Sequence, residues 1–258
     1  MRNSIALGTL CALGMTLMNV TANAQTIPEP IRAAVADPTR PDTDRARDPQ
    51  RKPAEVLSFA GVKPGDKVGE LLPGRGYFTG LFCRIVGSSG HVYTLNIKRT
   101  TPPMPPPGGA APSAPPPAPA APPCDNITAD TQAAADFALP GGLDVVWTSE
   151  NYHDLHNKMF GPADMLQVDK AIFKALKPGG VFIVEDHAAE AGSGARDTDT
   201  LHRIDPASVK AEVAAAGFVL EAESPLFANA ADDHTKFVFD PAIQGQTDQF
   251  LLRFRKPK

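Results

Sequence analysis

The sequence lacks an excess of basic residues and a metal-type spacing of cysteines, and each absence argues against one class of function. Lys and Arg number 25 against 29 Asp and Glu, which gives a formal net charge of −4 at pH 7. Nucleic-acid-binding domains usually carry a basic face, so this balance argues against such a partner. The chain has three cysteines, and they do not have the spacing of a metal site. Its apolar fraction of 42% is nevertheless ordinary for a globular protein with a full core.

The long apolar run of the sequence lies at the N-terminus. Ile5–Met18 follows Arg2 and is too short for a comfortable transmembrane helix. A positive residue, an apolar run and the small residues Ala22 and Ala24 are typical of a cleaved signal peptide. We therefore expect residues 1–24 to be removed on export, leaving a periplasmic or secreted bacterial protein without stable membrane insertion. A retained N-terminal anchor is the alternative.

Cleavage would leave two cysteines, Cys83 and Cys124, in an oxidising compartment where they can pair. Cys83 lies in an apolar segment beside Leu81, Phe82 and Ile85, which is predicted to be a helix. The sequence therefore favours a buried free thiol at this position, with a disulfide as the alternative.

The stretch 67–79, KVGELLPGRGYFT, combines an apolar strand, a tight turn and the first turn of a helix. Gly74 and Gly76 lack a Cβ, so the backbone can take positive φ and a ligand can approach closely. The following helix points unpaired N–H groups and its positive dipole end at the same place. Glu70 lies near the end of the strand, at the edge where open α/β sheets bind ligands. A ligand site is therefore predicted; a plain strand-turn-helix is the alternative.

Strand-like and helix-like segments alternate along most of the chain. The predicted strands are 68–72, 91–97, 126–129, 143–148, 181–184, 218–223 and 249–255. The predicted helices are 53–60, 77–86, a turn at 133–139, 161–176 and 206–216. This alternation, with apolar central strands, is typical of a mostly parallel sheet with helices on both faces. The last two strands have no helix between them, which indicates an antiparallel edge strand.

Composition divides the mature chain into unequal parts. Residues 25–52 are rich in Pro, Asp and Arg and are predicted to be a loose polar arm. Residues 53–258 form the predicted domain. Residues 101–123 are almost entirely Pro, Ala and Gly, so we expect a disordered or polyproline-like insert between the second and third strands. An inert loop is favoured there over a Pro-rich ligand for a partner's aromatic groove.

Polar residues gather where two predicted strands end. The strand at 143–148 runs into a polar cluster that contains His153 and Asp154, and the strand at 181–184 ends in Glu185-Asp186-His187. Histidine titrates near neutral pH and a neighbouring carboxylate can orient it, so His153 is our candidate base. His187 and His202 are secondary candidates, for which a hydrogen-bonded scaffold role is favoured.

Three segments in this order carry a family resemblance. They are VGELLPGRGYFTGLFCRIVGSSGHVYTLNI, LDVVWTSENYHDL and LKPGGVFIVEDH. Together they resemble the class I S-adenosylmethionine-dependent methyltransferases. A group of exported, predicted methyltransferases of undefined substrate is resembled more closely by the Tyr-His-Asp loop at 152–154 and by the segments TLHRIDPASVKAEVAAAGF and DDHTKFVFDPAIQGQTDQFLLRFRKP. The resemblance covers nearly the whole mature chain except the insert. It implies a Rossmann-like α/β fold, S-adenosylmethionine as cofactor and methyl transfer to an unidentified small molecule or envelope component.

The resemblance also implies roles for individual residues in cofactor binding. Glu70 would hold the amine end of the methionine, and Gly74 and Gly76 would let the cofactor lie against the turn. Asn96 would face the ribose hydroxyls, where the family commonly has Asp or Glu. An amide oxygen accepts such a bond but adds no charge. Pro73 replaces a usual glycine or small residue. The other expected cofactor contacts are Tyr77, Asn151 and, at the adenine edge, Asp136.

Methyl transfer chiefly requires proximity and in-line orientation, because the sulfonium is already activated. A base is needed only where the acceptor must lose a proton. On the resemblance, His153 with Asp154 would be that base, and Tyr152 would line the acceptor pocket.

Two other classes of function stay open. A binding protein that keeps this fold without its chemistry is favoured slightly by Asn96 and Pro73. The cytoplasmic supply of S-adenosylmethionine is an objection to an exported methyltransferase. A metal-dependent hydrolase ranks last, because no strong metal spacing appears and we expect no bound metal. Its ligands would come from His153, Asp154, His156, Asp186 and His187. The sequence gives no indication of the oligomeric state.

Overall fold

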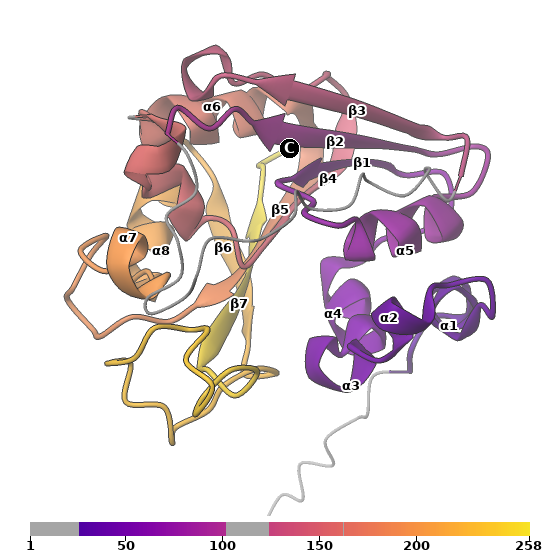
Figure 1. The fold of residues 1–258 in the computed structure, drawn as a ribbon. Helices are drawn as coiled ribbons and strands as arrows, with labels where there is room; N and C mark the ends of the chain where they lie inside the picture. The colour runs from indigo at the N-terminus through magenta and orange to yellow at the C-terminus, as the bar shows by residue number, and fades with distance from the viewer. Residues whose placement is uncertain (1–25, 102–123, 162) are drawn as a thin grey trace, which may run out of the picture.

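The computed structural model describes residues 26–101, 124–161 and 163–258 (Figure 1). The expected signal peptide and residues 102–123 of the expected insert lie outside these ranges. The strands are β1 (Lys67–Leu71), β2 (His91–Ile97), β3 (Ile127–Gln132), β4 (Leu143–Ser149), β5 (Leu176–His187), β6 (Val219–Ser224) and β7 (Gln249–Arg255). The α-helices are α1 (Glu29–Ala36), α2 (Asp42–Arg45), α3 (Asp48–Arg51), α4 (Pro53–Ala60), α5 (Tyr77–Val86), α6 (Met165–Ala175), α7 (Thr198–Leu201) and α8 (Pro206–Ala215). Short 3₁₀ turns are η1 (Ala134–Asp136), η2 (His153–His156) and η3 (Lys158–Phe160).

The seven strands form one sheet in the order β3-β2-β1-β4-β5-β7-β6. The pairs from β3 to β5 are parallel, whereas β7 is antiparallel to both β5 and β6. The predicted fold class is therefore confirmed, and the antiparallel strand is β7, one place in from the edge. The strand order changes direction between β1 and β4, which is where open α/β sheets bind ligands.

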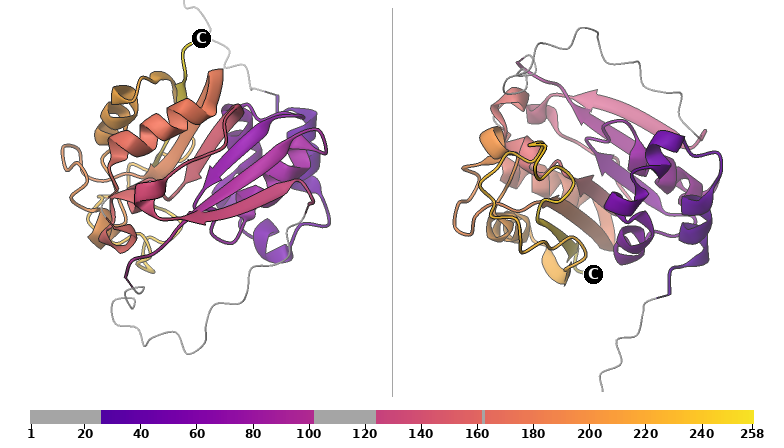
Figure 2. Two further views of the ribbon diagram at one scale, coloured as in Figure 1. Left: turned by 90° about the horizontal axis from the view of Figure 1, so that it is seen from above. Right: turned by 60° about the horizontal axis from the view of Figure 1, so that its bottom comes forward.

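Helices cover both faces of the sheet, as Figures 1 and 2 show from three sides. Side chains alternate between the faces along each strand. Val145 and Trp147 of β4 pack in the cluster that contains α1, α4 and α5, while Val146 packs in the cluster that contains α6 and α8. Because both faces are covered, the central strands are apolar on both sides.

Most predicted elements are present, and several have the predicted ends. Helix α4 begins at Pro53, and Gly61 ends it in the left-handed conformation with φ of 74°. Proline at the first helical position and glycine just after the last one explain both ends. Helix α8 begins after Asp205, whose side chain accepts a hydrogen bond from the backbone N–H of Ala207.

The segment 177–180, Lys-Pro-Gly-Gly, lies between the predicted helix at 161–176 and the predicted strand at 181–184, where we expected a turn, but the structure places it within β5. Leu143 of β4 pairs with Leu176, and Val145 pairs with Val181. Four residues of β5, 177–180, thus stand against one residue of β4, Asp144, so the extra residues bulge out of the ladder. The two glycines allow this local departure, and the strand continues beyond it.

The loose polar arm predicted at 25–52 is also wrong. Helices α1, α2 and α3 occupy this segment, and Ile31 of α1 is fully buried against α4 and α5. Arg40 forms two hydrogen bonds of 2.7 Å to the carboxylate of Asp48, which also accepts one of 2.6 Å from the hydroxyl of Tyr77. The charges of this segment pair with one another and with α5, which orders the chain despite its polar composition.

The expected free thiol at Cys83 is replaced by a disulfide to Cys124, whose Cα lies 6.2 Å away. The predicted burial of Cys83 is correct, since the residue is 2% exposed. The bond joins α5 to the segment that leads into β3. In the part of the chain that the structure describes, no helix is long and apolar enough to cross a membrane.

Candidate active site

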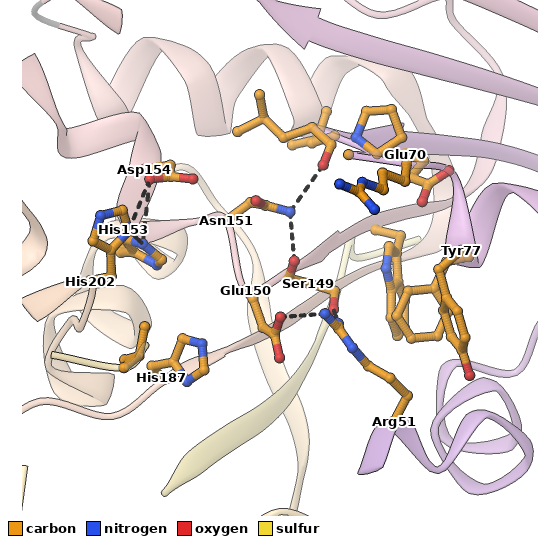
Figure 3. A pocket seen from close by; sticks show the side chains of 18 of the residues that line it. Arg51, Glu70, Tyr77, Ser149, Glu150, Asn151, His153, Asp154, His187 and His202 are labelled. Atoms are coloured by element: carbon orange, nitrogen blue, oxygen red, sulfur yellow. Dashed lines mark hydrogen bonds and ion pairs between the residues drawn. The ribbon is translucent and has the colours of Figure 1, made fainter. Parts of the chain in front are cut away.

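A cavity of about 390 Å³ lies at the carboxyl ends of β1 and β4 (Figure 3). Its volume is within the usual range for small-molecule sites. Its lining comes from the ends of these strands and of β5, the turn before α5, helix α3, the turns η2 and η3, and the segments that follow β2, α7 and residue 237. Glu70 and Tyr77 lie at one end of the cavity, and His153, Asp154 and His202 lie at the other.

The glycine turn has the backbone that the sequence predicts. Gly74 has φ of 57°, and Gly76, the residue before α5, has φ of 83°. Both values lie in the left-handed region, which glycine occupies at no steric cost. A Cβ added to Gly74 would meet no heavy atom within 4 Å, so open space lies above this residue. Gly74 lines the cavity, and the turn therefore exposes bare backbone to a ligand.

Glu70 is the buried acid of the cavity. It is 2% exposed, and one carboxylate oxygen accepts a hydrogen bond from the hydroxyl of Thr79 in α5. Burial raises the pKa of Glu70 to about 7, and the hydrogen bond from Thr79 opposes this rise only in part. A carboxylate with little water around it is poised to bind a cationic group, because such a partner would restore the lost solvation.

Backbone strain concentrates around the cavity. Five non-glycine residues in the described ranges have positive φ, and three of them line the cavity: Leu72 (48°), Glu150 (57°) and His202 (54°). Strained residues of this kind gather at functional sites. Asn151 holds two of these segments together, since its side-chain amide donates to the carbonyls of Leu72 and Ser149 at 3.0 and 2.6 Å.

The histidine end of the cavity is organised by Asp186, which the sequence linked to His153 only as a possible ligand of a metal-dependent hydrolase. The Nδ1 atom of His153 lies 2.8 Å from one carboxylate oxygen of Asp186. The backbone N–H of His153 donates a hydrogen bond to the other oxygen, also at 2.8 Å. Asp154, the predicted orienting group, lies instead beside Nε2 at 3.4 Å. The Nδ1 atom of His202 also lies near this Nε2, at 3.0 Å.

The pKa values of the two histidines are shifted in opposite directions. Burial lowers the pKa of His153, but the neighbouring Asp186 carboxylate outweighs it and the pKa is raised. Burial and the proximity of His153 together lower the pKa of His202 to about 4, so this imidazole is neutral at pH 7. A neutral His202 has an unprotonated nitrogen that can accept a proton or bind a metal.

Tyr152 does not line the cavity, and its predicted place in the acceptor pocket is wrong. The residue is fully buried, and its hydroxyl lies 2.9 Å from Asp169 of α6 and 3.0 Å from Glu212 of α8. His156 is also absent from the lining and lies 3.2 Å from Glu212. Both side chains therefore belong to a polar contact between η2 and the helices behind it.

The structure brings most of the predicted cofactor residues to the cavity. They are Glu70, Pro73, Gly74, Tyr77 and Asn151. Gly76, Asn96 and Asp136 do not line it. Their predicted contacts with a cofactor stay predictions.

Four arginines line the cavity, and sequence reasoning missed them all: Arg47, Arg51, Arg75 and Arg99. Arg51 pairs with Glu150 across the cavity wall. Two of the four lie in the segment that was expected to be a loose arm, so their position depends on a fold that was not predicted. Arg75 was visible in the sequence, within the glycine turn itself.

No protein-family profile and no curated protein sequence matches this chain. Solved structures are similar to it at low identity. A SAM-dependent methyltransferase from Aquifex aeolicus is 14% identical, with 84% of this chain and 98% of that chain covered and a TM-score of 0.51. The N-methyltransferase NodS from Bradyrhizobium japonicum WM9 is 14% identical, with 84% and 99% covered and a TM-score of 0.50.

A third structure holds ligands. The geranyl diphosphate C-methyltransferase from Streptomyces coelicolor A3(2) was solved with Mg²⁺, geranyl diphosphate and S-adenosyl-L-homocysteine. It is 12% identical, with 87% of this chain and 88% of that chain covered and a TM-score of 0.52. These likenesses show that the chain has the Rossmann-like fold of SAM-dependent methyltransferases. They do not carry a function over to this chain, because one fold supports many activities.

Proposed function

We propose that the protein is an S-adenosylmethionine-dependent methyltransferase that acts on a small-molecule or envelope acceptor. The cavity carries this proposal. It lies at the point where the strand order changes, above a glycine turn with open space over Gly74, and it has the buried acid Glu70 at one end. The sequence resemblance and the shared fold of the solved methyltransferases support the same conclusion.

The Glu70 end would bind the cofactor. The cationic amine of S-adenosylmethionine would meet the Glu70 carboxylate, and the nucleoside would lie against the bare backbone of the turn. The N-terminus of α5 points its unpaired N–H groups to the same region. Asn151 would fix the separation of the two strand ends on which the cofactor rests.

The histidine end would bind the acceptor. His153 and Asp154 are the predicted catalytic residues that line the cavity, and they lie across it from Glu70 (Figure 3). Arg99 lines the wall near them, and no salt bridge to it occurs among the described residues. An acceptor with a negative charge would complement this guanidinium.

Export to the periplasm or beyond is part of the proposal. The disulfide between Cys83 and Cys124 supports it, because such bonds persist mainly in oxidising compartments. Fractionation of cells that express the full chain tests it. A protein that stays in the cytoplasm with residues 1–24 attached would contradict export.

A binding protein without catalysis is the second candidate. Asn96, where the resemblance puts the ribose contact, does not line the cavity, and this observation favours that candidate. Turnover separates the two functions. Formation of S-adenosylhomocysteine from S-adenosylmethionine in the presence of an envelope extract would show transfer. Tight binding of both nucleosides with no such formation would show a binding protein.

Calorimetry with S-adenosylmethionine and S-adenosylhomocysteine tests the cofactor site. We expect Glu70→Gln to weaken binding of S-adenosylmethionine at least tenfold, since it removes the charge that meets the amine. Asp169→Asn is the matched control, because Asp169 is equally buried but does not line the cavity. No binding of either nucleoside at millimolar concentration, or equal affinity in wild type and Glu70→Gln, would contradict the proposed site.

A further inference from the structure

We propose that His153, His202 and Asp154 form a binding site for a divalent transition-metal ion at the acceptor end of the cavity. The three residues come from two places in the chain: His153 and Asp154 are adjacent in η2, and His202 follows α7. They converge on one point, as Figure 3 shows. All three line the cavity, so an ion bound by them would face the space where a substrate binds.

The distances among the ligand atoms fit an ion. Nε2 of His153 lies 3.0 Å from Nδ1 of His202 and 3.4 Å from Oδ1 of Asp154, and the last two atoms lie 3.7 Å apart. Three points with these separations lie on a circle of radius about 2.0 Å, which is the length of a metal–nitrogen bond in proteins. An ion close to the plane of the three atoms would therefore reach each of them without rearrangement.

The surroundings hold these ligands in place. Asp186 accepts the hydrogen of His153 Nδ1 at 2.8 Å, which leaves Nε2 directed to the ion. Metal-binding histidines usually have such a carboxylate on the other ring nitrogen. The ring of His202 packs edge-on against Phe237 and Phe239, with centroids 5.3 and 5.7 Å away. Its backbone has φ of 54°, a strained conformation kept at the one residue that completes the ligand set.

The ligand set indicates which ions bind. Two imidazoles and one carboxylate suit Zn²⁺, Fe²⁺ or Co²⁺, whereas Mg²⁺ prefers oxygen ligands. The three side chains occupy three coordination positions of the ion and leave its other coordination positions open, as in catalytic metal sites. This site differs from the hydrolase ligands considered in the sequence, because His156 lies outside the cavity and Asp186 supports His153 from behind.

The open positions give the ion a role in the proposed function. An acceptor with a hydroxyl or carboxylate oxygen would complete the coordination and would be held facing the cofactor end. His153 would then position the acceptor through the ion, in place of taking a proton from it. This role rests on the proposed methyltransferase function, whereas the ion site itself rests on the geometry alone.

Titration of the full chain with metal tests the site. After removal of metal by a chelator, we expect one equivalent of Zn²⁺ to bind, and Co²⁺ to give a visible absorption band that Zn²⁺ displaces. Mg²⁺ at the same concentration should not compete. His202→Ala and Asp154→Asn should each weaken Zn²⁺ binding at least tenfold, and Asp186→Asn should weaken it 10- to 100-fold.

His91→Ala is the matched control, because His91 begins β2 and does not line the cavity. It should leave Zn²⁺ affinity unchanged, and circular dichroism should show that every variant is folded. Absence of the Co²⁺ band in the wild type, or unchanged Zn²⁺ affinity in both His202→Ala and the conservative Asp154→Asn, would overturn the metal site. S-adenosylhomocysteine affinity, measured in parallel, separates the two proposals, since nucleoside binding without metal binding contradicts this one alone.

Discussion

Glu70→Gln should make the unliganded protein more stable at pH 8, although it removes a residue of the proposed cofactor site. The carboxylate of Glu70 is buried and the described residues place no cation on it. Gln has nearly the shape of the protonated side chain and keeps an oxygen that can accept the hydrogen bond from Thr79. The substitution therefore replaces a group that is costly to ionise with one that is never charged.

The size of the effect follows from the pKa of Glu70, which burial raises from 4.5 to about 7. A carboxyl group with a raised pKa favours the fold while it is protonated. Its contribution is complete below about pH 4.5 and is lost as the pH rises through about 7. Each tenfold change in acidity corresponds to 1.36 kcal/mol, so the loss amounts to about 3 kcal/mol above pH 7. Glu70→Gln should remove this loss.

Urea denaturation of the full chain at pH 5, 6, 7 and 8 measures the effect. Wild type should lose stability over this range, since burial also raises the pKa of Asp169 and Glu185 to about 7. Asp169→Asn should reduce the slope of unfolding free energy against pH about as much as Glu70→Gln does. Nucleoside affinity should fall only in the Glu70 variant.

The reasoning would be refuted if wild type and Glu70→Gln had parallel curves between pH 5 and pH 8. Parallel curves would mean that Glu70 ionises in the fold as readily as in the unfolded chain. A cation or water would then have to reach its carboxylate without ligand. A curve for Glu70→Gln that lies below wild type at pH 8 would contradict the sign of the effect.

Three further predictions concern other parts of the molecule. Gly74→Val should lower nucleoside affinity at least tenfold in calorimetry. It should also cost about 1–2 kcal/mol of stability, because residue 74 has a left-handed backbone. An unchanged nucleoside affinity in the variant would count against the turn as a cofactor site. Cys124→Ser should lower the unfolding free energy by about 4 kcal/mol, because the disulfide to Cys83 joins two residues with a sequence separation of 41 and so closes a long loop. Equal urea midpoints for the oxidised and the reduced wild-type protein would contradict this. Ile31→Ala should cost about 2–5 kcal/mol in urea denaturation because Ile31 is fully buried, whereas a disordered segment would show no change.

The sheet could be predicted largely because its signals are local. Each strand is a short apolar run bounded by glycine, proline or polar residues, and each main helix has recognisable ends, as Gly61 and Asp205 show. The order β3-β2-β1-β4-β5-β7-β6 was not predicted, because pairing between distant strands leaves little trace in either strand alone. The bulge at 177–180 escaped prediction because proline and glycine mark turns and strand irregularities equally well.

In the candidate site, too, the contacts between residues close in sequence could be predicted, and the contacts between distant segments could not. The glycine turn and Glu70 are contiguous in sequence, so their meeting needed only one strand and one helix. The pairing of His153 with Asp186 and His202 joins segments 33 and 49 residues apart, and nothing local indicates it. Tyr152 precedes His153 directly, yet the 3₁₀ turn sends its side chain into the core.

The N-terminal helices show why polar composition alone led to the wrong prediction of a loose arm at residues 25–52. A run of Asp, Arg and Pro has the same composition whether its charges meet water or one another. Here Arg40 is buried against Asp48, and Asp48 in turn receives the hydroxyl of Tyr77, the first residue of the helix after the glycine turn. This chain of contacts ties α3 to the same helix whose N-terminus faces the proposed cofactor. The position of Arg47 and Arg51 on the cavity wall therefore depends on the packing of α3 against α5, so a ligand that contacts both would also stabilise the N-terminal helices.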